Sequence, residues 1–249
     1  MIKWRFVIHG GIDGFSRTVT YLKCSTNNRA NTVLNNFLAS IQEYRCPLRI
    51  RSDYGTENVR VAEWMLEHHG ADSKPFITGK SVHNQRIERL WLDIKVNVII
   101  FCSDLFKEFE SEGILDVDNE KHLFALHFVY LPRINKLLQQ FKASWNNHPL
   151  RTARNMSPIR LWTEGFYRSL EEGILEATAI EIDDEYGIDF DGPIPEIETE
   201  NNVQVPPVSF ELTAEQETYL VNHFDPMERD AEYGKNTLIN VIAYLDTLE

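Results

Sequence analysis

The sequence contains little cysteine and no long apolar run, and each absence excludes a class of protein. Its three cysteines, Cys24, Cys46 and Cys102, form neither a CxxC pair nor an even-numbered framework. We therefore expect reduced structural thiols in an intracellular protein, and neither a disulfide scaffold nor a zinc site. The eight histidines also show no zinc-ligand spacing. Apolar runs reach only about five residues, as in 98–102, which is too short to span a membrane.

The N-terminal stretch MIKWRFVIHGG has neither the apolar length nor the cleavage site of a signal peptide. Together with the missing membrane span, this predicts a protein of the nucleus or cytoplasm. The sequence shows no internal repeat. A chain of 249 residues is therefore expected to form one large domain, or one domain with an appendage.

The net charge of −13 is distributed unevenly along the chain. Residues 1–165 contain 22 Lys and Arg against 17 Asp and Glu, whereas residues 166–249 contain 3 against 21. A mildly basic part followed by an acidic part is typical of a polyanion-binding core with an acidic tail. An acidic tail that only keeps the protein in solution fits equally well, and charge alone does not decide between them.

Alternating strand-like and helical patterns predict a mixed α/β fold. Residues 4–12 and 18–22 are rich in β-branched and aromatic residues, and Asp13-Gly14 between them predicts a hairpin, because both residues tolerate positive φ. Further strands are expected at 48–52 and 74–78, and helices at 29–44, at 58–70, from residue 84 onward and at 122–146. One face of the helix from residue 84 is apolar and consists of Ile87, Leu90, Trp91, Ile94 and Val98.

The composition changes in the C-terminal third of the chain. Residues 183–208 are acidic and proline-containing, which is typical of a linker. Thr213 and Gln216 form a capping box ahead of a helix, and a second helical pattern follows at 237–248. The predicted organisation is a core at 1–165, an acidic linker at 166–208 and a small helical segment at 209–249.

Two acidic residues occupy positions that suit a metal site. Asp53, in RSDYGTEN, follows a predicted strand, and ligands of open α/β sheets gather at the carboxyl ends of strands. Glu88, in HNQRIERLW, lies in the first turns of a helix, where the helix dipole favours a carboxylate. Carboxylates from different elements suffice to hold the two Mg²⁺ ions that promote phosphoryl transfer between nucleic-acid strands.

Four segments of the chain resemble retroviral-type integrase cores. RSDYGTEN resembles the segment of the second catalytic carboxylate, and SVHNQRIERLW resembles that of the third. The 34 residues between Asp53 and Glu88 are close to the spacing of that family. WRFVIHGGIDGFSR resembles the second strand and its turn, and WNNHPLRTARNMSPIRLW the segment that closes the core. The resemblance covers residues 3–165. Within this family, the chain is most similar to integrase-core proteins of eukaryotic genomes that look like relic or domesticated mobile-element genes.

The resemblance implies an RNase H-like mixed sheet flanked by helices. It also implies that Asp53 and Glu88 are catalytic residues that bind Mg²⁺ or Mn²⁺. Glu57 is less suited as a ligand, and it is expected to cap or orient groups near the site. Taken alone, an Asp-Tyr-Gly sequence is usually a turn and a glutamate on a helix is usually solvated; the paired motifs at family spacing favour the metal site.

Basic and polar residues near Glu88 fit DNA as the partner. Gln85, Arg86, Arg89 and Lys95 lie on or beside the helix face that carries Glu88, and would contact phosphates. An ordinary charged helix surface explains them almost as well. Trp91 is expected in the core rather than as a base-stacking platform, and His83 in a loop rather than as a ligand.

In the family, the first catalytic aspartate lies one strand before the segment that Asp13 matches. Asp13 is therefore expected to be a turn residue, with the first carboxylate upstream of Met1 and the first strand missing. The strands at 4–12 and 48–52, which that strand would separate, should then either pair with each other or remain apart across a gap. A regular five-stranded sheet would contradict this interpretation.

Two functions follow from the resemblance. One is integrase-like DNA strand transfer or cleavage by two-metal phosphoryl transfer, impaired in this chain by the missing acid. The alternative is a non-catalytic, domesticated DNA-binding or protein-interaction module. The acidic residues 166–249 would, in a further hypothesis, occupy the basic face and inhibit DNA binding. No membrane contact is expected, and homo-oligomerisation is left open.

Overall fold

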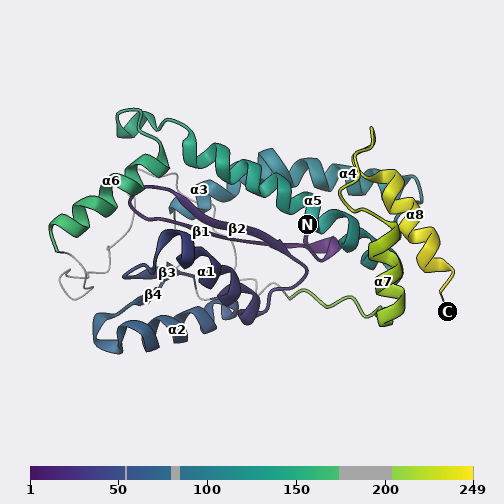
Figure 1. Cartoon of the computed structure of the whole chain (residues 1–249), viewed down its shortest axis with the longest axis horizontal. Helices are drawn as coiled ribbons and strands as arrows, with labels where there is room; N and C mark the ends of the chain where they lie inside the picture. Colours follow the sequence, from purple (N-terminus) through teal and green to yellow (C-terminus); the bar gives the residue numbers. More distant parts are fainter. Residues whose placement is uncertain (54, 80–84, 174–203, 249) are drawn as a thin grey trace.

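The computed structural model describes residues 1–53, 55–79, 85–173 and 204–248, and it is a mixed α/β fold in which helices dominate (Figure 1). The strands are β1 (Val7–Ile12), β2 (Val19–Ser25), β3 (Ile50–Ser52) and β4 (Phe76–Thr78). The helices are α1 (Ala30–Tyr44), α2 (Val59–His69), α3 (Gln85–Ile94), α4 (Ile100–Ser111), α5 (Glu120–Asn147), α6 (Pro158–Glu171), α7 (Ala214–His223) and α8 (Lys235–Asp246). The predicted strands and helices are all present, most of them with shifted ends.

β1 and β2 form the predicted antiparallel hairpin, but its turn differs from the prediction. Asp13 shapes the turn through its side chain: its carboxylate accepts hydrogen bonds from the Ser16 backbone N–H at 2.7 Å and from the Ser16 hydroxyl at 2.6 Å. The residue with positive φ is Arg17, at 64°, and not Asp13 or Gly14. Asp13 is thus a turn residue, as expected, and the turn is longer than a two-residue Asp-Gly hairpin because β2 begins only at Val19.

Side chains of α5 cover the edge of β2 that faces away from β1. Asn146 accepts from the backbone N–H of Val19 at 2.8 Å and donates to its carbonyl at 3.0 Å. Asn135 makes the same pair of bonds with Cys24, at 2.9 and 3.1 Å. The two asparagines satisfy backbone groups that a neighbouring strand would otherwise bind, so α5 ends the sheet on this side.

The strands do not form one sheet in the described residues. β3 pairs in parallel with β4, with Ile50 opposite Phe76, while β1 and β2 form a separate antiparallel pair. Of the two outcomes expected for residues 4–12 and 48–52, direct pairing is therefore not found. The two strand pairs remain apart, which fits the other expected outcome, and the RNase H-like sheet stays a prediction.

The predicted long helix from residue 84 comprises α3, a π-helical turn at Lys95–Ile99, and α4. The apolar face is confirmed, since Leu90, Ile94 and Val98 are buried. Trp91 is partly buried against the core, as expected. A π-helical turn widens the helix by one residue, and such turns often occur at functional sites.

The main core contains residues of β2, α3, α4, α5 and α8. Leu238, Val241 and Leu245 of α8 are fully buried in it, so the predicted C-terminal helical segment packs directly on α5. α7 begins with the predicted capping box of Thr213 and Gln216. Most of the predicted linker, residues 174–203, lies outside the described residues.

A second, smaller core lies between α1 and α2. Its buried residues are Val33, Phe37, Val61 and Met65, and Ile50 of β3 packs against them. β3 and its neighbour β4 therefore depend on a separate cluster from the one that supports β1. None of the helices in the described ranges is long and apolar enough to cross a membrane.

Candidate metal and DNA site

Asp53 follows β3 directly, at the carboxyl end of that strand, and is exposed. Its Oδ1 accepts hydrogen bonds from the side-chain amide of Asn58 at 3.2 Å and from the backbone N–H of Gly55 at 3.4 Å. These bonds close a turn that leads into α2. Because both go to the same oxygen, the turn orients the carboxylate and directs its other oxygen away from these two donors.

Glu57 lies in the same turn. Its carboxylate packs against Gly55 and fills the space that a Cβ on that residue would need. Glycine is thus required at residue 55 if Glu57 is to keep this position. The hydrogen-bond donors that orient Asp53 are Gly55 and Asn58, so the orienting role expected of Glu57 stays a prediction.

Glu88 lies in the first turn of α3 and is half-buried. The fold relates it to Asp53 through the strand pair β3–β4: the strands are parallel, so both end at the same edge. The pairing extends one step beyond the strands, since the Gly79 N–H donates to the Ser52 carbonyl at 3.1 Å. Asp53 and the chain that leads to α3 therefore leave one edge together. The loop residue His83 lies outside the described residues.

The two acids match the chemistry of a hard divalent cation. Carboxylate oxygen is the ligand that Mg²⁺ and Mn²⁺ prefer. No cluster of three or more acidic side chains at metal-ligand distances occurs within the described ranges. Asp13 lies in the hairpin turn, where Ser16 binds its carboxylate.

The predicted DNA-contacting residues differ in their surroundings. Lys95 is exposed at the start of the π-helical turn, and Arg86 is half-buried. Arg89 is exposed and pairs with Asp93 at 3.3 Å, one turn along the same helix. Gln85 begins α3, and its side chain lies outside the described part of the structure. Lys95 thus presents its charge to solvent, whereas Arg89 must exchange Asp93 for a phosphate.

The described part of the acidic C-terminal region lies elsewhere. α7 and α8 occupy the end of the molecule opposite α6, and α8 packs on α5 (Figure 1). These helices therefore do not cover α3. The hypothesis of an inhibitory acidic tail receives no support from residues 204–248.

The fold also assembles a group that the sequence did not predict. Cys46, His68 and His69 each place a potential metal-ligand atom within 4.8 Å of the others. Sequence spacing gave no sign of this group because β3 and most of α2 lie between Cys46 and the two histidines. The one local signal was a His-His pair at the end of a predicted helix.

The described residues form a mixed α/β core, with helices around two separate strand pairs. Comparison with protein families identifies the group to which this core belongs: the family described as Integrase core domain matches residues 1–175, and the chain belongs to it. Curated proteins and solved structures gave no match. The family match confirms the resemblance to retroviral-type integrase cores. Integrase cores bind DNA and use divalent metal ions.

Proposed function

We propose that this integrase core performs metal-dependent phosphoryl transfer on DNA, as strand transfer or cleavage, with Asp53 and Glu88 binding Mg²⁺ or Mn²⁺. The observation that carries the proposal is the placement of the acids. Asp53 is held by its turn at the carboxyl end of β3, and the parallel strand β4 leads from the same edge to the helix that presents Glu88. This is where α/β proteins commonly bind ligands.

The residues present fit the bound ion by their donor chemistry. When bound, divalent ions neutralise charge on the attacking and leaving oxygens of the phosphoryl group. Asn58 and Gly55 fix Asp53 so that one oxygen stays directed outward. Glu88 lies in the first turn of α3, where the helix dipole attracts negatively charged groups. Both carboxylates are therefore suited to bind a divalent cation.

DNA would lie along α3. Gln85, Arg86, Arg89 and Lys95 would contact phosphates, and the affinity would fall steeply with salt and depend little on sequence. An exposed ion pair such as Arg89–Asp93 contributes little to stability. Arg89 can therefore leave Asp93 for a phosphate at small cost.

A second candidate function is a DNA-binding module without catalysis. The observation that favours it is that the described residues contain no group of three acidic side chains at metal-ligand distance from one another. Transfer by two acids should be slow compared with a complete three-carboxylate site. The two candidates predict different results in one assay.

That assay is nicking of supercoiled plasmid DNA by the whole chain, with Mg²⁺, Mn²⁺ or EDTA. Catalysis predicts slow nicking that requires metal and disappears in Asp53→Asn and in Glu88→Gln. The matched control is Glu63→Gln, which removes an exposed acid of α2 paired with Arg60 and should keep the activity. DNA binding without nicking, unchanged by EDTA, would reject catalysis and support the binding module.

A further inference from the structure

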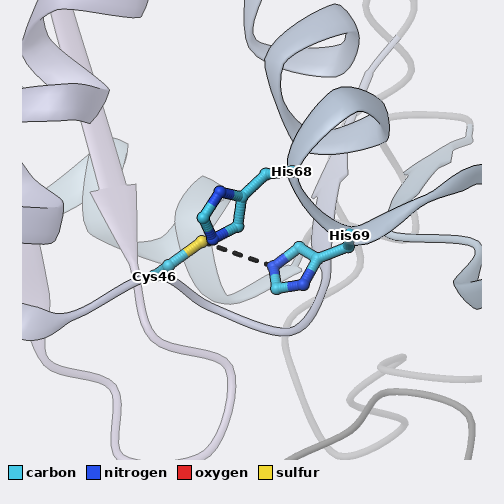
Figure 2. A group of neighbouring side chains, drawn as sticks. All are labelled: Cys46, His68 and His69. Carbon is cyan, nitrogen blue, oxygen red and sulfur yellow. Dashed lines mark hydrogen bonds between the residues drawn. The ribbon is translucent and has the colours of Figure 1, made fainter.

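A thiol and two imidazoles meet at one end of the smaller core. Cys46 lies in the segment after α1, and His68 and His69 are the last residues of α2. The Cys46 Sγ lies 3.3 Å from the His69 Nε2, and one ligand atom of each residue lies within 4.8 Å of the others. Figure 2 shows the thiol directed toward both rings.

We propose that Cys46, His68 and His69 bind one Zn²⁺ ion. Zinc prefers thiolate and imidazole ligands, at about 2.3 Å for sulfur and about 2.0–2.1 Å for nitrogen in a tetrahedral arrangement, so its ligand atoms lie roughly 3.3–3.6 Å apart. The Cys46–His69 pair already has this separation. The remaining separations are at most 4.8 Å and need to shorten by up to about 1.5 Å, which a movement of the exposed His68 side chain supplies.

The ligand types separate this group from the proposed site at Asp53 and Glu88. It contains no carboxylate, so hard cations such as Mg²⁺ have little affinity for it. Three protein ligands leave a fourth position open to water. The partial exposure of the three side chains gives an ion direct access from solvent.

The neighbours of the imidazoles support this arrangement. His68 stacks on Trp64, with ring centroids 4.7 Å apart and planes 12° from parallel, and it is the exposed member of the group. His69 Nε2 lies 3.0 Å from the Pro47 carbonyl, which accepts the ring proton in the tautomer that carries it on Nε2. Binding zinc through Nε2 moves that proton to Nδ1 and releases the Cys46 thiol proton to solvent, which balances the exchange.

The site would stabilise the part of the fold that carries Asp53. It joins the segment before β3 to the end of α2, beside a core of only four buried residues. A metal that binds the folded form alone adds its binding free energy to folding. Zinc would thus hold together α1, α2 and β3, the strand that positions Asp53.

The test is a titration of the whole chain with Co²⁺, which reports thiolate ligation by a charge-transfer band, followed by displacement with Zn²⁺. One equivalent of cobalt should give the band, and Mg²⁺ should not remove it. Cys46→Ser should abolish the band, and His69→Ala should weaken zinc binding by at least the roughly 10–100-fold typical of lost outer-shell partners. The control His223→Ala, at an exposed histidine of α7, should behave like the unchanged chain.

A second readout covers variants that fold poorly. His68 is exposed, so His68→Ala should fold, yet lose the rise in Tm that zinc gives the unchanged chain over EDTA. Asp53→Asn should keep both the band and the rise, which separates this proposal from the proposed function. No band in the unchanged chain, or the same band in Cys46→Ser, would overturn the proposal, because a remaining thiolate would then be Cys24 or Cys102.

Discussion

The indole of Trp91 lies against Gly10 of β1: a Cβ on residue 10 would come within 3.0 Å of its Cη2 atom. Trp91 is one turn along α3 from Glu88. The contact therefore sets how closely the helix that carries Glu88 approaches β1, and it needs a residue without a side chain at position 10.

Adding a methyl group at this contact should destabilise the protein. Gly10→Ala places a Cβ 3.0 Å from Trp91 and 3.2 Å from Leu22, so both must move, and overpacking of this kind costs about 1–3 kcal/mol. The control is Gly14→Ala, where a Cβ would meet nothing within 4 Å. Chemical denaturation measures the free energy of unfolding of both variants. Equal stabilities of the two variants would show that Gly10 is not needed for packing.

Asn146 and its neighbour Asn147 provide a matched pair for the edge of β2. Asn146→Ala leaves the buried N–H and carbonyl of Val19 without partners, which costs roughly 1–3 kcal/mol for each unsatisfied group. Asn147 only donates to the Ala143 carbonyl within its own helix and is exposed, so Asn147→Ala should change little. Chemical denaturation gives the free energy of unfolding of each variant. A similar loss of stability in both variants would contradict the role of Asn146 at the edge of β2.

Glu120 should make stability depend on pH in the acid range. Hydrogen bonds from the Arg5 guanidinium, at 2.6 and 2.9 Å, and from the Ser209 N–H lower its pKa from 4.5 to about 2. A pKa lowered by folding adds stability that is present above the unfolded value and is lost as pH falls through the folded one. The advantage of the unchanged chain over Glu120→Gln should therefore be constant above pH 4.5 and shrink toward pH 2.

Urea denaturation at a series of pH values measures this advantage. Glu164→Gln, which breaks an exposed ion pair with Arg160, is the control and should have a smaller effect at neutral pH. A gap between the unchanged chain and Glu120→Gln that stays the same from pH 5 down to about pH 2 would contradict the role of Arg5.

DNA affinity should lose part of its salt dependence when Lys95 is removed. Each phosphate contact contributes about one unit to the slope of log affinity against log salt, so Lys95→Ala should reduce the slope by about one. Lys107→Ala removes an exposed lysine of α4, which pairs with Asp104, and should leave the slope unchanged. Fluorescence anisotropy of labelled DNA over a range of salt concentrations measures the slope for each variant. Identical slopes would remove Lys95 from the DNA interface.

Local patterns predicted much of the fold. The apolar face of Leu90, Ile94 and Val98 identified a helix, and the Thr213–Gln216 capping box fixed the start of α7. The hairpin was predicted correctly, but its turn was not. An Asp-Gly step favours a two-residue turn, yet the Asp13 carboxylate binds Ser16, and the turn continues through residues 14–16 to Arg17, which has positive φ.

Long-range features were missed for a physical reason. The length allowed either one large domain or one domain with an appendage, and the helical pattern of α8 did not show that Leu238, Val241 and Leu245 lie in the main core. The group of Cys46 and two histidines exists only because α2 returns the chain to the end of α1. Composition and spacing do not report such contacts. The placement of Asp53 after β3 followed from the strand pattern alone.

The most direct test of the central claim, that Asp53 and Glu88 bind the same divalent ion, is Mn²⁺ binding followed by electron paramagnetic resonance. It compares the unchanged chain, Asp53→Asn, Glu88→Gln, their double variant and the control Glu63→Gln. Each single change should weaken binding at least about tenfold, and the double variant should lose less than the two losses combined, because ligands of one ion are coupled. Additive losses, or unchanged binding in either single variant, would contradict a shared site.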